Sequence, residues 1–316
     1  MRVLVTGATG FVGRALCREL LRRGHTVVAA VRREAELPDG CETRLVAEIG
    51  PDTDWSATLV GIDAVAHLAA RVHVMRASAA DELAAYRRTN VEGTLRLARA
   101  AAQAGVERFV FLSSIKVMGE VSPHGPLTEA DPPRPQDPYA VSKLEAERGL
   151  SEVAGRYAMG LVILRPPLVY GPGVKGHFHS LLRLVDRGVP LPLGAIDNRR
   201  SLLYLGNLAD AIGLCLSHPA APGKTFLLRD GEDLSTPDLV RRLAAALGRR
   251  SFLFSFPPSW LLPMARALGR GGQAERLLGS LCLEDRPIRQ ELGWPPPFTV
   301  QDGLRETAEW YRAVSS

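Results

Sequence analysis

Tyr139 and Lys143 lie four residues apart, a spacing that puts two side chains on the same face of a helix, about one turn from each other. A phenol normally keeps its proton up to about pH 10. A neighbouring ammonium favours the phenolate and lowers that pKa. We therefore expect Lys143 to bring the pKa of Tyr139 towards neutrality, so that the pair can act as a general acid and base.

The residues around this pair predict the elements that must hold it. Asp137 can cap a helix and Pro138 suits its first turn, so a helix is expected to begin here. An earlier apolar run, Arg108–Ser113, predicts a buried strand. That strand would deliver Ser113 and Ser114 to the carboxyl edge of a sheet, where open α/β sheets bind ligands.

A glycine-rich loop near the start of the chain predicts a second functional feature. The run Arg2–Thr6 reads as a buried strand, and Phe11–Arg23 reads as an amphipathic helix. Glycines between such elements let the backbone approach a pyrophosphate, whose charge faces the helix N-terminus. A plain glycine turn is the alternative. The expected cofactor contacts are Gly7, Thr9, Gly10, Phe11, Val12 and Gly13.

The end of the second expected strand, Thr26–Val31, bears on the choice of cofactor. An acid commonly holds the ribose 2′-hydroxyl at this place, but here Arg32 and Arg33 follow the strand. Because a guanidinium pairs well with a phosphate, we favour NADP over NAD and expect both arginines to contact the cofactor. Alternatively, this is a solvated basic turn in which Glu34 still reaches the ribose.

Two further strands are expected to frame the rest of the dinucleotide. Glu42–Glu48 predicts a third strand, whose end places an acid and an apolar side chain beside the adenine. Asp63–Leu68 predicts a fourth, followed by small residues that let the cofactor pass closely. A long helix is expected over Ala79–Gln103. The contacts predicted here are Glu48, Ile49, Leu68, Ala69 and Ala70.

The alternation of strands and helices predicts an α/β fold, a Rossmann doubly wound parallel sheet with helices on both faces. We place the NAD(P)-binding domain at residues 1–166, with a return contribution near 201–222. Residues 167–316 are expected to form mainly a smaller, mixed α/β substrate-binding domain.

Composition sets limits on compartment and partners. The 316 residues carry a net charge of +5, which permits an anionic substrate, but no basic run or aromatic–basic platform indicates nucleic-acid binding. The four cysteines are scattered without a CxxC pair, so we expect reduced thiols, no metal site and a cytoplasmic protein. Prolines interrupt the apolar stretch Phe252–Leu268, so no membrane span is expected.

Several motifs together resemble the extended short-chain dehydrogenase/reductase family, the NAD-dependent epimerases and dehydratases. The resemblance implies that Tyr139 is the acid/base, that Lys143 holds the nicotinamide ribose and that Ser114 hydrogen-bonds the reacting oxygen. Ser113 is the second choice for that last role. The resemblance further implies a supporting role for Asn90 beside the cofactor, and a cofactor contact at Pro166. The matching segments are 6–13, Ser114 with Tyr139 and Lys143, 90–94, 165–172, 200–205, 207–210 and 291–294.

The residues after Ser114 discriminate among branches of this family. Dehydratases of the family carry an Asp-Glu pair there, whereas this chain has Ile115 and Lys116, and an isoleucine cannot transfer a proton. The chain is similar to bacterial UDP-sugar 4-epimerases and to 4-reductases of UDP-4-keto-6-deoxy-N-acetylhexosamines. Because of Arg32 and Arg33 we favour an NADPH-dependent 4-ketoreductase of surface polysaccharide synthesis. A 4-epimerase with tightly bound NAD is the alternative, and a non-catalytic dinucleotide sensor is a remote third.

A UDP-sugar presents a diphosphate that basic side chains should meet. The resemblance points first to Arg200. No clear diphosphate motif precedes the segment 291–294, where only Asp285 and Arg286 are near. A homodimer through the helices that carry Asn90 and Tyr139 is also implied by the resemblance. The predicted substrate contacts are Ser114, Lys116, Lys175, Arg199 and Arg200.

Overall fold

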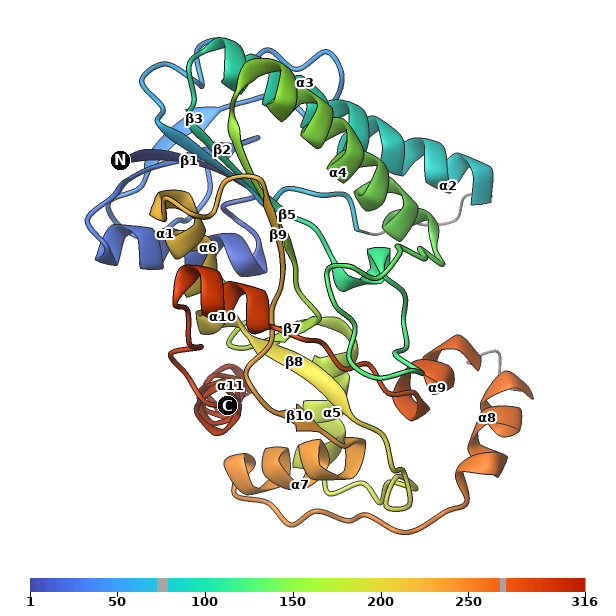
Figure 1. The fold of residues 1–316 in the computed structure, drawn as a ribbon. Coiled ribbons are helices and arrows are strands. Elements are labelled where there is room, and N and C mark those ends of the chain that lie inside the picture. The colour runs from blue at the N-terminus through green and yellow to red at the C-terminus, as the bar shows by residue number, and fades with distance from the viewer. Residues whose placement is uncertain (73–78, 268–270, 316) are drawn as a thin grey trace.

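The computed structural model describes residues 1–72, 79–267 and 271–315 of the chain. Its main sheet has seven parallel strands in the order β3-β2-β1-β4-β5-β6-β9 (Figure 1). The strands are β1 (Arg2–Thr6), β2 (Thr26–Val31), β3 (Glu42–Leu45), β4 (Ala64–His67), β5 (Arg108–Leu112), β6 (Gly160–Arg165) and β9 (Lys224–Leu227). The surrounding helices are α1 (Phe11–Arg22), α2 (Ala79–Tyr86), α3 (Thr94–Gln103), α4 (Pro138–Tyr157) and α6 (Leu205–Ser217).

Helices cover both faces of this sheet, as the sequence predicted. Successive side chains of a strand point to opposite faces. Val3 and Val5 therefore pack in one core with α1 and α6, whereas Leu4 packs in a second core with α3 and α4. Burial of apolar side chains on both faces accounts for the nearly continuous apolar runs of the central strands. The predicted α/β doubly wound fold is confirmed.

The expected helix over Ala79–Gln103 is wrong in one respect, because it is not a single α-helix. A π-helical segment, η1 (Arg87–Gly93), separates α2 from α3 and contains the buried Asn90. Such wide turns inside a helix often mark functional places. Here the wide turn coincides with the hydrogen bonds of Asn90 described below.

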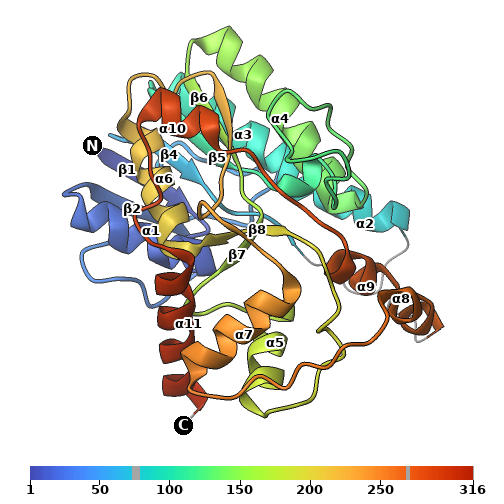
Figure 2. The same cartoon turned by 60° about the horizontal axis from the view of Figure 1, so that its bottom comes forward.

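A second lobe is built on a three-stranded sheet and has its own core. Its helices α5, α7 and α11 lie together in Figure 2, while α8 and α9 lie at one edge. The domain boundary near residue 166 stays a prediction, since α6 and β9 return from beyond it to the main sheet. The elements are β7 (Leu168–Tyr170), β8 (Arg200–Tyr204), β10 (Asp233–Leu234), α5 (Gly176–Asp186), α7 (Thr236–Leu247), α8 (Pro258–Ala267), α9 (Gly271–Leu278) and α11 (Val300–Ser315). Helix α10 (Arg286–Leu292) packs instead in the core of the main sheet.

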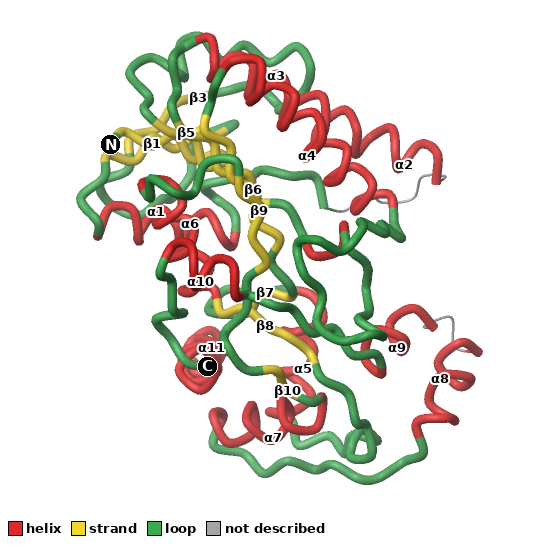
Figure 3. Tube along the Cα trace, viewed as in Figure 1, coloured by secondary structure: helices red, strands yellow, loops and turns green. Residues whose placement is uncertain are grey.

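A long loop between β5 and α4 reaches from the main sheet to the second lobe (Figure 3). It begins with the 3₁₀ turn η2 (Ile115–Val117). Further along, the backbone N–H of Ser122 donates to the carbonyl of Ser280 at 2.9 Å, and that of Leu127 donates to Cys282 at 2.8 Å. The loop is therefore tied to the strand-like segment before α10. No helix in the described residues is long and apolar enough to cross a membrane.

The buried carboxylate of Asp230 joins elements of both lobes. It accepts hydrogen bonds from the hydroxyl of Tyr170 at 2.8 Å, the backbone N–H of Tyr204 at 2.7 Å and the amide of Asn207 at 2.8 Å. Burial raises the pKa of Asp230 to about 6. Three donors converge on this carboxylate, so it holds the ends of β7 and β8 and the start of α6 in place.

Asp230→Ala should destabilise the protein by roughly 3 kcal/mol or more, because several buried donors lose their acceptor at once. Glu232→Ala is the matched control. It removes an exposed carboxylate that pairs with Arg242, and it should cost less than about 1 kcal/mol. Urea unfolding of both variants measures the difference. Equal losses of stability would contradict the role assigned to Asp230.

Candidate functional site

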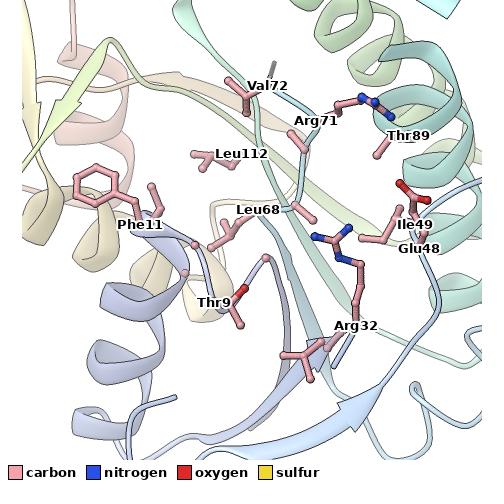
Figure 4. Close-up of a pocket in the computed structure, with 18 of the residues that line it drawn as sticks. Thr9, Phe11, Arg32, Glu48, Ile49, Leu68, Arg71, Val72, Thr89 and Leu112 are labelled. Carbon is pink, nitrogen blue, oxygen red and sulfur yellow. The ribbon is translucent and has the colours of Figure 1, made fainter. Parts of the chain in front are cut away.

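A cavity of about 680 Å³ lies at the carboxyl ends of β1, β2, β4 and β5 (Figure 4). Its volume is within the range of small-molecule and cofactor sites. The predicted cofactor contacts that line it are Gly7, Thr9, Gly10, Phe11, Val12, Gly13, Arg32, Glu48, Ile49, Leu68, Ala69, Ala70, Tyr139 and Lys143. Three predicted cofactor contacts, Arg33, Asn90 and Pro166, are not among the lining residues.

The glycine loop forms one wall of this cavity and cannot carry side chains at two positions. A Cβ at Gly13 would lie 2.1 Å from the carbonyl oxygen of Gly7. Gly7 itself has a φ of +70° and would bring a Cβ to 2.9 Å from the backbone nitrogen of Ala69. No side chain caps α1, which begins after Gly10. Its first N–H groups and its dipole therefore suit the phosphates of a dinucleotide.

The end of the cavity where the adenosine is expected combines a cation with an acid. Arg32 reaches into the cavity from the end of β2, towards Glu48 and Ile49 in Figure 4. Arg33 and Glu34 are exposed on the same turn, outside the lining. Of the two arginines predicted to meet the cofactor, the structure thus brings Arg32 to the site. The contact predicted for Arg33 stays a prediction.

Helix α4 presents Tyr139 and Lys143 at the other end of the cavity. Asp137 caps this helix, since its Oδ1 accepts from the backbone N–H of Ala140 at 2.7 Å, and Pro138 occupies the first turn. The ring of Tyr139 meets the ring of Tyr86 edge to face, with centroids 6.0 Å apart. The Nζ of Lys143 lies 4.0 Å from the ring centroid of Phe111.

The pKa expected for Tyr139 from the sequence is wrong for this structure. Burial, followed by the charge of Asp137 and the neighbouring Tyr86, raises the pKa of Tyr139 to about 12. Burial also lowers the pKa of Lys143 to about 7, against the opposing effect of Glu147. Desolvation disfavours both charged forms, so it exceeds the mutual stabilisation expected from the spacing alone. Tyr139 therefore holds its proton at neutral pH.

The two serines at the end of β5 have different surroundings. Ser113 lines the cavity, but its hydroxyl donates to Glu147, which also forms a buried ion pair with Arg165 at 2.6 Å. Ser114 lies at the start of η2, where its Oγ accepts from the backbone N–H of Lys116 at 3.3 Å. An accepting hydroxyl still has its own proton to donate. The catalytic role of Ser114 stays a prediction.

Asn90 does not line the cavity but forms hydrogen bonds to the segments that do. Its Oδ1 accepts from the backbone N–H of Arg71 at 2.8 Å, and its Nδ2 donates to the carbonyl of Arg71 at 3.1 Å and to the Oγ of Ser142 at 3.0 Å. Ser142 stands next to Lys143. Asn90 thus ties the cavity wall after β4 to the helix that carries the acid/base pair.

The remaining predicted contacts lie away from the cavity lining. Lys116 forms ion pairs with Asp137 at 2.5 Å and with Glu120 at 3.5 Å. Arg200 donates to the carbonyl of Gly279 at 2.8 Å. Lys175 and Arg199 are exposed. The backbone carbonyl of Pro166 accepts from the N–H of Ile115 at 2.9 Å, which fixes the turn after Ser114. Their contacts to substrate or cofactor stay predictions.

Sequence reasoning missed several residues of the site. Arg71, Val72, Thr89 and Leu112 line the cavity, and Tyr86 donates to the carbonyl of Val72 at 3.0 Å. Arg71 and Val72 directly follow the small residues that were predicted as contacts, so extending that segment would have found them. The packing of Tyr86 against Tyr139 could not be predicted, because the two residues are far apart in the sequence and meet only in the folded protein.

Gly13→Ala should weaken NAD binding by roughly tenfold or more, because overpacking strain of about 1–3 kcal/mol falls on the loop that forms the cavity wall. Gly155→Ala is the control, since this exposed position on α4 has nothing within 4 Å of its added Cβ. Titration calorimetry with NAD measures both variants. Unaltered affinity in Gly13→Ala would contradict the role of the loop.

Two named proteins are similar in sequence to this chain over nearly its full length. A UDP-glucose 4-epimerase of Vibrio cholerae is 42% identical over 318 residues, which cover 97% of this chain and 94% of that protein. A 3-beta-hydroxysteroid dehydrogenase of Mycolicibacterium neoaurum is 30% identical over 346 residues, which cover 98% of this chain and 91% of that protein.

A solved structure is similar to this chain over its whole length. MoeE5 in complex with UDP-glucose and NAD has a TM-score of 0.79 and 31% identity to this chain, with 100% of both chains covered. The sequence pattern of the NAD dependent epimerase/dehydratase family matches residues 3–228. This span contains the glycine loop, Ser114, Tyr139 and Lys143. The protein, an enzyme, therefore belongs to the NAD-dependent epimerase/dehydratase family.

Proposed function

We propose that this enzyme is a 4-epimerase of a UDP-hexose or UDP-N-acetylhexosamine that works with a nicotinamide dinucleotide. The observation that carries the proposal is that Tyr139 and Lys143 line the same cavity as the glycine loop. The Vibrio cholerae relative, named a UDP-glucose 4-epimerase, supports the reaction class, and the NAD and UDP-glucose bound to MoeE5 support the ligands.

The residues of the chain have distinct tasks in this reaction. The bound nicotinamide supplies the hydride acceptor and donor at C4 of the sugar. Tyr139, as the phenolate, takes the proton of the C4 hydroxyl when the sugar is oxidised, and as the phenol it returns that proton when the sugar is reduced. Lys143 holds the nicotinamide ribose, and Ser114 donates a hydrogen bond to the reacting oxygen. Arg200, Lys175, Arg199 and Lys116 are the proposed contacts to the sugar nucleotide.

NADPH-dependent reduction of the C4 carbonyl of a UDP-4-keto-6-deoxy-N-acetylhexosamine is the second candidate. Two observations favour it. Arg32 enters the cavity and would suit a 2′-phosphate. Tyr139 holds its proton at neutral pH, which is the form needed to protonate a reduced carbonyl. A homodimer through the helical segments that carry Asn90 and Tyr139, η1 and α4, also stays a prediction.

Tyr139→Phe should lower turnover by at least about a hundredfold, because it removes the group that exchanges the proton. NMR of UDP-glucose and UDP-galactose in the presence of the enzyme and NAD measures interconversion without net use of the cofactor. Tyr157→Phe is the control, since this exposed tyrosine lies at the far end of the same helix. Loss of NADPH with the 4-keto sugar, without any interconversion, would favour the reductase instead.

Arg32→Ala should weaken NADP binding by roughly tenfold while leaving NAD binding within a few-fold, if Arg32 meets a 2′-phosphate. Arg33→Ala is the comparison and should have the smaller effect, because its side chain lies outside the cavity lining. Titration of each variant with both dinucleotides gives the ratio. An equal loss for both cofactors in Arg32→Ala would indicate that this guanidinium does not discriminate between them.

A further inference from the structure

The aromatic ring of Phe111 lies directly against the amine of Lys143. Phe111 stands on β5, three residues before Ser114, and its ring centroid is 4.0 Å from the Nζ of Lys143 on α4. The two residues are 0% and 2% exposed. A cation at this range is attracted to the electron-rich face of an aromatic ring, and the attraction grows when water is excluded. The contact therefore favours the charged, ammonium form of Lys143.

A neutral histidine on the neighbouring strand fixes the ring of Phe111. His67 on β4 is the cross-strand partner of Phe111, and the two rings stack with centroids 5.9 Å apart and planes 19° apart. The two ring nitrogens of His67 form hydrogen bonds with the hydroxyls of Thr6 at 2.7 Å and Thr94 at 2.8 Å. Burial, followed by the charge of Lys143, lowers the pKa of His67 to about 3. The imidazole is therefore neutral at physiological pH and does not repel an ammonium beside Phe111.

The anion that acts on Lys143 has other partners. Glu147, one turn further along α4, raises the pKa of Lys143 against the effect of burial. Its carboxylate also forms the buried ion pair with Arg165 at 2.6 Å and accepts from Ser113. Lys143 therefore shares this anion with an arginine, and the ring of Phe111 supplies a second attraction that offsets part of the cost of burial. The titratable groups that the packed elements bring to this end of the cavity are Glu147 and Tyr139 on α4, His67 on β4, Arg71 after β4, Arg165 on β6 and Tyr86 on α2.

We propose that Phe111 is a positioning residue that holds the ammonium of Lys143 against its ring face by a cation–π interaction. Because β5 also leads to Ser113 and Ser114, one strand carries both this platform for the lysine and the predicted partner of the reacting oxygen. Its consequence for the cofactor rests on the proposed function, in which Lys143 holds the nicotinamide ribose.

Fluorination of Phe111 tests the interaction, because fluorine withdraws negative charge from the ring face and changes the size of the ring little. Replacing Phe111 by mono-, di- and trifluorophenylalanine should lower the pKa of Lys143 stepwise, by about one unit at the third fluorine. The pH above which NAD binding weakens should fall by the same amount, since the ammonium is then lost at lower pH.

The titration is followed by NMR of ¹³Cε-labelled lysine in the full-length protein, without added sugar nucleotide. The spectrum is simple because the chain has four lysines, Lys116, Lys143, Lys175 and Lys224. Lys143→Met identifies the signal of interest.

The same series of fluorinated residues at Phe109 is the matched control. Phe109 is also 0% exposed, lies two residues earlier on the same face of β5 and meets the ring of His67 at a centroid distance of 5.9 Å. Fluorination there should leave the titration of Lys143 in place. Urea unfolding of both trifluorinated proteins checks that the two series are equally stable.

A flat titration across the Phe111 series, or equal shifts in the two series, would overturn the proposal, since packing alone predicts no dependence on the charge of the ring face. The titration needs no sugar nucleotide and no turnover, so it is separate from the proposed function. A stepwise fall of the pKa without any effect on NAD binding would retain the contact and reject the task assigned to Lys143. Normal epimerase turnover with a flat titration would retain the proposed function and reject the contact.

Discussion

The buried amine of Lys143, whose pKa burial lowers to about 7, is the constraint on which the site depends. An ammonium removed from water is costly unless other groups compensate it. Here Phe111 lies beneath it, and Glu147 stands one helical turn further along. Glu147 in turn binds Ser113 and Arg165 at the ends of β5 and β6. These contacts fix the register of α4 on the sheet and so place Tyr139 at the cavity.

A second constraint is the amide of Asn90. It holds the backbone on both sides of Arg71 and the hydroxyl of Ser142, so one side chain connects η1, the loop after β4 and α4. The wide turn of η1 interrupts what would otherwise be a continuous helix. Asn90 therefore supports the wall of the cavity without lining it, and its contact to the cofactor stays a prediction.

Local patterns in the sequence determined much of the fold and part of the site. Apolar runs predicted the strands β1, β2, β4 and β5 of the main sheet, because buried parallel strands must be apolar on both faces. The glycines at 7 and 13 predicted the loop because no larger residue fits there. The cap at Asp137 and the spacing from Tyr139 to Lys143 predicted which helix carries the pair and which face it shows.

The tertiary structure alone decided how those residues behave. The pKa of Tyr139 is raised because the fold removes water from the phenol, an effect that no spacing reports. The partner of Ser113 is Glu147, and that of Lys116 is Asp137, although each pair is far apart in sequence. The types of residue and their helical spacing are local and were readable from the chain. Burial and partners arise only when distant segments pack, and these set the charges of the site.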